Sequence, residues 1–290
     1  MKKNASLSPQ TDYGLDPKIG FTWKSVLGLI LIFAVWLILS PLFVSLANSL
    51  FPATISGFPG LVVLYLSFVT LPLGLFLVGK LFFGISPLKL LTEGRRPNIR
   101  RIVLYFCSTL LLCLLYLLLD WMLHPAVFSV DFRLIPWLRS LAAAPLILLA
   151  AASEELLFRG YLYRMFRPLK NGSVWAILLP GLLFCLIHGY NPEAAANPLP
   201  AFLYYLTMAL LLGFIARRTN GLGAPIAAHF AINLFLASIL TYPSSTLEGT
   251  GIGGIIVREK LEFGFVLIVL FVMVIGYTAY PFFLRKRGRK

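Results

Sequence analysis

Two adjacent glutamates, Glu154 and Glu155, stand at the end of a long apolar segment of the chain. Two later apolar segments carry one histidine each, His188 and His229. An ionisable side chain within a lipid bilayer costs from about 3 kcal/mol upward. Such groups persist in membrane segments where they have a function, so these carboxylates and imidazoles predict a functional site inside the membrane.

The same residue types suit the hydrolysis of an amide bond. A carboxylate in a low-dielectric site can act as a general base near neutral pH, and a neighbouring imidazole can share the water that the carboxylate activates. His229 and Asn233 are i, i+4, so both side chains can donate hydrogen bonds to one developing oxyanion. One glutamate and two histidines, here Glu154, His188 and His229, also form a known catalytic zinc set. The residues leave both mechanisms open, and we favour water activation without a metal.

Two further pairs share a helix face. Glu155 and Arg159 are i, i+4 and can form an ion pair, which leaves Glu154 about 100° away around the helix. Phe184 and His188 have the same spacing, so the phenyl ring can pack against the imidazole. These spacings predict one carboxylate held in a pair and the other available for chemistry.

The elements that carry these residues are membrane segments. The chain has 290 residues, of which 59% are hydrophobic and only 12% are charged, whereas a soluble domain carries about 25% charged residues. A membrane span needs roughly 20 apolar residues. Eight segments qualify, and we expect an all-α, multi-pass protein. They cover about residues 25–50, 58–80, 102–123, 136–158, 173–190, 198–216, 222–242 and 262–284.

Positive charge gives the orientation of these segments. All but four of the 25 Lys and Arg residues (Arg133, Arg139, Arg258 and Lys260) lie in the two ends of the chain or in alternate connections on the same side. The positive-inside rule then predicts eight spans with both termini in the cytoplasm. We expect a polar arm over residues 1–24, one transmembrane domain over 25–284 with its motifs at about 140–240, and a basic tail over 285–290.

The net charge of +14 follows the same distribution. No aromatic and basic nucleic-acid module is visible, so we expect anionic membrane lipids rather than nucleic acid as the partners of these charges.

The motifs resemble those of the CAAX prenyl protease type II family, the intramembrane glutamic endopeptidases also called CPBP or Abi. Three motifs carry the resemblance, in the family's order and in three different apolar segments. They are Glu154-Glu155-x-x-x-Arg159, Phe184-x-x-x-His188 and His229-x-x-x-Asn233.

The resemblance implies a role for each residue. Glu154, assisted by His188, would activate water, and His229 with Asn233 would stabilise the oxyanion. Glu155 and Arg159 would be structural or substrate-orienting. The family is all-helical with eight spans, and its eukaryotic members cleave prenylated C-terminal tripeptides. The implied substrate here is a membrane-associated peptide or protein, and the text around the first motif is typical of bacterial members, which favours a bacterial plasma membrane.

Two other classes of function fit the buried polar cluster. Glu154, His188 and His229 would relay protons or coordinate an ion in a transporter or channel. A catalytically silent membrane scaffold would keep the same fold. The absence of a visible inverted repeat argues against the transporter, and the intact motifs favour an enzyme over the scaffold.

Overall fold

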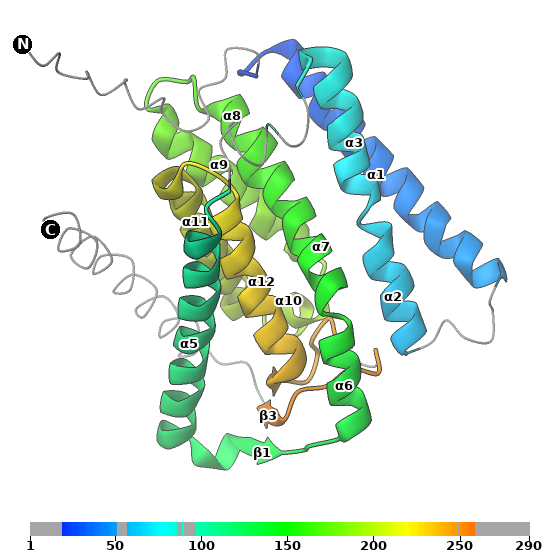
Figure 1. Cartoon of the computed structure of the whole chain (residues 1–290), viewed down its shortest axis with the longest axis vertical. Coiled ribbons are helices and arrows are strands. Elements are labelled where there is room, and N and C mark those ends of the chain that lie inside the picture. The colour runs from blue at the N-terminus through cyan, green and yellow to red at the C-terminus, as the bar shows by residue number, and fades with distance from the viewer. Residues whose placement is uncertain (1–18, 51–56, 86–88, 90–96, 249, 259–290) are drawn as a thin grey trace, which may run out of the picture.

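The computed structural model describes residues 19–50, 57–85, 89, 97–248 and 250–258. This part of the chain is a bundle of helices with one small sheet at one end (Figure 1). The predicted helical fold is confirmed, and the sheet is an addition that the sequence did not predict. Most of the predicted arm, the last predicted span and the basic tail lie outside the described residues.

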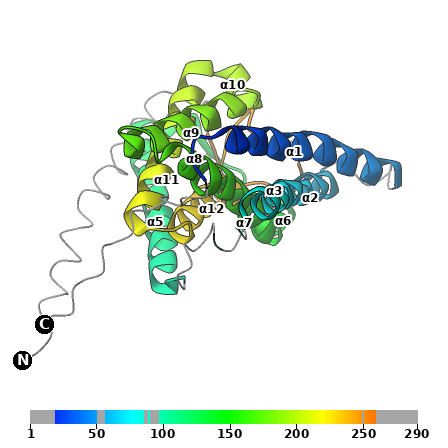
Figure 2. The same cartoon turned by 90° about the horizontal axis from the view of Figure 1, so that it is seen from above.

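A hairpin of helices forms one side of the bundle (Figures 1 and 2). Its elements are α1 (Trp23–Leu50), α2 (Phe58–Ser67), α3 (Thr70–Val78) and the π-helix η1 (Gly79–Phe83). The Ser40 hydroxyl donates to the Ser67 hydroxyl at 2.7 Å between the two arms. The hydroxyl of Tyr161 donates to the carbonyl of Ser25 at 2.8 Å. Gly28 leaves room for this contact, because a Cβ there would lie 2.5 Å from the Tyr161 oxygen.

The next helices carry the first motif. They are α5 (Ile99–Leu123), α6 (Leu134–Ala142), α7 (Ala144–Glu155), the π-helix η3 (Leu156–Leu162) and α8 (Tyr163–Phe166). The predicted span 136–158 is therefore a broken helix, bent by 45° between α6 and α7. Pro145 in the first turn of α7 explains the break, because proline lacks the amide hydrogen that would continue the helix.

The last described helices carry the other two motifs. They are α9 (Gly172–His188), the short α10 (Pro192–Ala196), α11 (Pro198–Thr219) and α12 (Gly223–Ser238). Helix α12 packs against α5, α7 and α11, so it lies at the centre of the bundle. His229 and its helical neighbours Ala228 and Ala231 are buried there. Small residues let the surrounding helices approach closely, as is common in membrane bundles.

A three-stranded sheet joins two connections that are far apart in the sequence. Its order is β1 (Phe128–Val130), β3 (Ile256–Arg258), β2 (Leu240–Thr241), and the 3₁₀-helix η2 (Pro125–Val127) leads into β1. Strand β1 is antiparallel to β3, and β2 is parallel to it. The sheet thus ties the connection after α5 to the one after α12 at the same end of the bundle (Figure 1).

Within the described residues, four helices are long and apolar enough to cross a membrane, and the bent pair α6–α8 makes a fifth. Helices α9 and α12 are apolar but shorter, with 17 and 16 residues. A multi-pass membrane protein follows from these helices. The count of eight spans and the side of each terminus stay predictions.

Candidate active site

Glu155 connects the other side chains of the buried polar cluster through hydrogen bonds. Its side chain is fully buried, and its Oε1 accepts a hydrogen bond from Arg159 Nη1 at 2.7 Å and another from His229 Nδ1 at 2.9 Å. Arg159 Nη2 donates to the carbonyl of Ala209 at 2.8 Å. The expected Glu155–Arg159 pair is present, and it joins the first motif to α11 and α12.

A π-helix begins directly after this glutamate. Glu155 is the last residue of α7, and η3 holds the buried Arg159. Single π-turns within helices are rare and occur mostly at functional sites. The distortion includes Arg159, the last residue of the first motif, so it sets the direction in which that side chain leaves the helix.

Glu154 differs from Glu155 in that its carboxylate accepts no hydrogen bond from another described side chain, although Oε2 of each glutamate is buried without a donor in the described structure. Its side chain is 15% exposed, and its Oε2 lies 3.8 Å from His229 Nε2. That oxygen is buried and accepts no hydrogen bond from the described residues. An unpaired buried carboxylate oxygen is unfavourable, so its retention indicates a task other than stability.

His188 is held by aromatic rings and by one backbone bond. Its ring is stacked on Phe184 with the centroids 4.1 Å apart, as the spacing predicted, and the centroid of Tyr205 lies at 4.5 Å. Its Nδ1 lies 2.8 Å from the Phe184 carbonyl. A carbonyl only accepts, so Nδ1 carries a proton, and in the neutral ring Nε2 has a free lone pair.

The two histidines and Glu154 face one region of the bundle. The Phe184 ring also contacts His229, with the centroids 6.1 Å apart. The two imidazole centres are therefore separated by no more than the sum of their distances to that ring, about 10 Å. Glu154 Oε2 lies 3.8 Å from His229 Nε2, which places the carboxylate in the same region.

Asn233 lies one turn after His229 on α12. It is partly buried, and its side chain makes no hydrogen bond to another described residue. The amide can therefore turn to a ligand on the same face as His229.

Two polar residues next to this cluster belong to none of the three motifs. Tyr205 contacts His188, and the buried Glu193 accepts a hydrogen bond from the Tyr205 hydroxyl. Glu193 lies between the second and third motifs, in the short helix α10. Its position three residues after Tyr190, in a polar connection, carries no sequence signal of burial.

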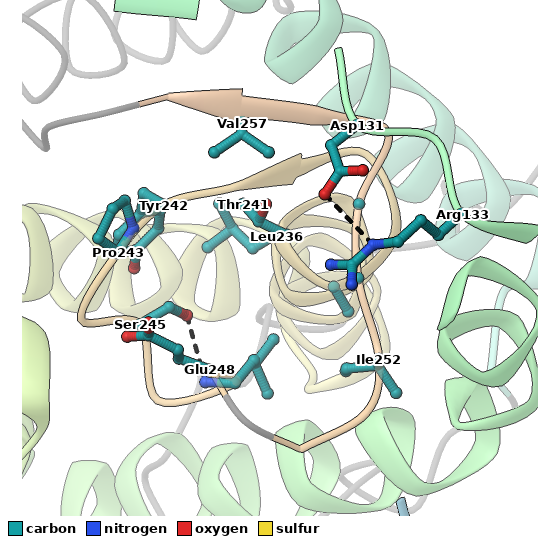
Figure 3. Close-up of a pocket in the computed structure, with 14 residues that line it drawn as sticks. Asp131, Arg133, Leu236, Thr241, Tyr242, Pro243, Ser245, Glu248, Ile252 and Val257 are labelled. Carbon is teal, nitrogen blue, oxygen red and sulfur yellow. Dashed lines mark hydrogen bonds and ion pairs between the residues drawn. The ribbon is translucent and has the colours of Figure 1, made fainter. Parts of the chain in front are cut away.

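A cavity of about 260 Å³ lies nearby, at the end of α12 (Figure 3). Leu236 and Ala237 of α12 line it. Asp131 and Arg133, which form an exposed ion pair at 3.2 Å, also line it. No residue of the three motifs lines this cavity. The cavity therefore lies where the sheet and the loop after α12 cover one end of the bundle.

The zinc alternative needs three ligands directed at one point. Among the described residues, no three His, Cys, Asp or Glu side chains form a group that could hold a metal ion. The grouping of Glu154, His188 and His229 around one metal ion is therefore not found in the described residues, and no step proposed below passes through a metal.

Residues 136–235 match the family model described as "Type II CAAX prenyl endopeptidase Rce1-like". The resemblance drawn from the three motifs is confirmed. The Rce1-like region runs from α6 to α12 and includes every motif residue named above.

The chain is also similar to the uncharacterized protein YyaK of Bacillus subtilis (strain 168), with 30% identity over 161 residues. That alignment covers 55% of this chain and 54% of YyaK, so the chain spans about half the length of this curated relative. No solved structure matches the chain.

Proposed function

We propose that the chain is an intramembrane endopeptidase in which Glu154 activates water. The observation that supports this most is the buried Glu154 Oε2, which lacks a hydrogen-bond donor in the described structure and lies 3.8 Å from His229 Nε2. The Rce1-like match gives the reaction class, hydrolysis of a peptide bond.

The proposed first step uses Glu154 and His188. The Glu154 carboxylate takes one proton from a water molecule, and the free lone pair of His188 Nε2 accepts a hydrogen bond from the other. The resulting hydroxide attacks the carbonyl carbon of the scissile peptide bond. Two acceptors orient the water, because the Nδ1 proton of His188 is already committed to the Phe184 carbonyl.

The proposed second step uses His229 and Asn233. The carbonyl oxygen becomes an oxyanion and accepts hydrogen bonds from His229 Nε2 and the Asn233 amide. Because His229 Nδ1 already donates to Glu155, an Nε2 donor requires the doubly protonated ring, and the Glu155 carboxylate stabilises its positive charge. When the intermediate collapses, the C–N bond breaks and protonated Glu154 returns its proton to the leaving amine.

We further propose eight spans with both termini in the cytoplasm and one transmembrane domain over residues 25–284. Contacts between connections support this arrangement. Arg101 Nη1 donates to the Thr219 carbonyl at 2.9 Å, joining two connections predicted to be cytoplasmic. At the other end, β1 pairs with β3, and Thr246 bonds to Glu193, joining three connections predicted to lie outside.

The proposed substrate is a membrane-associated peptide or protein, prenylated or not, in a bacterial plasma membrane. The test is a cleavage assay on the purified full chain with internally quenched peptides, some with a prenylated cysteine three residues before the C-terminus. We expect cleavage by the wild type, none by Glu154→Ala or His229→Ala, and no effect of a chelator. Cleavage that survives both substitutions would refute the site.

The assay also separates the alternatives. Loss of cleavage on chelation, with recovery on adding zinc, would establish the metal mechanism. Proton flux into liposomes that depends on Glu154, without hydrolysis of any peptide, would favour the transporter.

A further inference from the structure

Glu193 is a buried acid that the proposed reaction does not use. It is 6% exposed, although it lies in the short helix α10 between α9 and α11. Its Oε1 accepts a hydrogen bond from the Tyr205 hydroxyl, and its Oε2 accepts one from the Thr246 backbone amide at 3.0 Å. The Thr246 hydroxyl donates to Oε2 at 2.9 Å. A buried carboxylate is stable only when it is bonded in this way.

These bonds join a distant loop to the second motif. Thr246 lies in the loop after β2, 53 residues from Glu193. Tyr205 lies on α11, and its phenol oxygen accepts a hydrogen bond from Asn191 Nδ2 at 2.8 Å. The Tyr205 ring in turn contacts the imidazole of His188, with the centroids 4.5 Å apart. A continuous path therefore runs from the loop through Glu193 and Tyr205 to His188.

We propose that Glu193 and Tyr205 are positioning residues that hold His188 in place by tying the loop at residues 241–248 to α11. Among the described residues, the imidazole makes one hydrogen bond, to the Phe184 carbonyl. That bond leaves its ring free to tilt about the Nδ1–O direction. Contact with Tyr205 on a second side removes this freedom, and the two bonds to Glu193 and Asn191 fix the phenol. This inference rests on the proposed function, in which His188 Nε2 orients water.

A misplacement of about 1 Å at a reacting group can cost roughly 100-fold in rate. The clamp of Glu193, Tyr205 and Thr246 is therefore expected to affect kcat far more than KM. If Glu193 only anchored the loop, substituting it would leave the position of His188 unchanged, because Glu193 does not bond His188.

The first arm of the experiment requires no substrate. The chain has three histidines, so uniform ¹³C,¹⁵N labelling of histidine gives three imidazole signals, assigned with one His→Gln variant each. At fixed pH, Glu193→Gln, Tyr205→Leu and Thr246→Val are expected to shift the His188 signal and leave the His124 signal in place. Thr246→Val keeps the Glu193 charge, so its shift reports a change of position rather than of charge.

Two variants serve as matched controls. Glu248→Gln changes a glutamate in the same loop whose side chain bonds only Ser244 among the described residues, and Tyr190→Phe changes an exposed tyrosine next to α10. Both are expected to leave the His188 signal unchanged. An unchanged His188 signal in Glu193→Gln and Thr246→Val would overturn the clamp. These two substitutions are mild, so they decide the question where Tyr205→Leu does not fold.

The second arm measures cleavage of the best quenched peptide. We expect kcat to fall roughly 10-fold in Glu193→Gln and roughly 100-fold in Tyr205→Leu at nearly constant KM, with Tyr205→Phe between the wild type and Tyr205→Leu. A wild type that cleaves nothing would refute the proposed function, while the first arm would still decide the clamp. Full kcat in the clamp variants of an active protein would refute the clamp alone.

Discussion

Two buried clusters of this protein contain the same types of side chain but differ in how completely their carboxylates are bonded. The outer cluster, named for its place at the sheet end of the bundle, consists of Tyr116, Asp120, His124 and Arg258. In it, Asp120 Oδ1 lies 2.9 Å from His124 Nδ1, and Asp120 Oδ2 accepts bonds from Arg258 Nε, at 2.9 Å, and from the Tyr116 hydroxyl. In the first motif, Glu155 Oε1 is bonded to Arg159 and His229, whereas Glu154 Oε2 and Glu155 Oε2 have no donor among the described residues.

This difference separates stability from reactivity. A carboxylate whose oxygens are both bonded is held in its charged form and contributes to structure. A buried carboxylate oxygen without a donor gives up stability, and it can accept a proton from a bound water. An acid, an arginine and a histidine in contact therefore do not identify an active site. The spare acceptors separate the first motif from the Asp120 cluster, and the one that lies 3.8 Å from His229 Nε2, on Glu154, is the base of the proposed reaction.

The largest effect is expected from removing that acceptor. Glu154→Gln is nearly isosteric, and it is expected to lower kcat by about 10²–10⁴-fold, because an amide cannot act as a base. Thermal unfolding in detergent is expected to stay within a few degrees of the wild type, since Oε2 makes no hydrogen bond that the variant would lose. A large drop in stability with retained kcat would remove the distinction between the two clusters.

The second effect tests the outer cluster. Asp120→Asn is expected to destabilise the protein by about 3–5 kcal/mol, because Arg258 is 2% exposed and would lose its charged partner. Activity per folded molecule should not change. The matched control is Asp131→Asn, since Asp131 is 50% exposed and pairs with Arg133 at the surface. Its effect should be about 1 kcal/mol or less.

A third effect concerns the oxyanion pair. Asn233→Ala is expected to lower kcat by about 10²–10³-fold, the usual loss for one oxyanion donor. The side chain bonds no other described residue, so stability should change little. The measurement is single-turnover cleavage together with thermal unfolding. A wild-type rate in Asn233→Ala would assign the oxyanion to His229 alone.

The sequence predicted what helix geometry fixes locally. The Glu155–Arg159 pair and the Phe184–His188 stack both follow from an i, i+4 spacing, and both are present. Contacts between distant residues could not be predicted in this way. His229 is 74 residues from Glu155, and Thr246 is 53 from Glu193. No spacing rule applies over such distances, because tertiary packing alone brings these residues together.

The fold shows the same division between features that local sequence predicts and features that tertiary packing decides. The apolar segments predicted the helices, because burial in lipid requires long apolar runs. The sheet was missed because its strands have two or three residues, too few to show an alternating pattern. The π-helix η3 was missed because no residue pattern in Leu156–Leu162 distinguishes a π-turn from an α-helical turn. Pro145 was the one local signal of the break between α6 and α7, and the continuous apolar run around it concealed the break.

The smallest effect comes from the histidine of the outer cluster, and it tests whether contact with an acid is sufficient for function. His124 and His229 each place Nδ1 2.9 Å from a buried carboxylate oxygen. His124 is 49% exposed, so His124→Gln is expected to cost about 1 kcal/mol or less and to leave kcat unchanged. His229→Gln should abolish cleavage, because glutamine cannot bond Glu155 and also present a cationic donor beside Glu154. Equal losses in the two variants, measured on one peptide, would show that reactivity does not depend on the spare oxygen of Glu154.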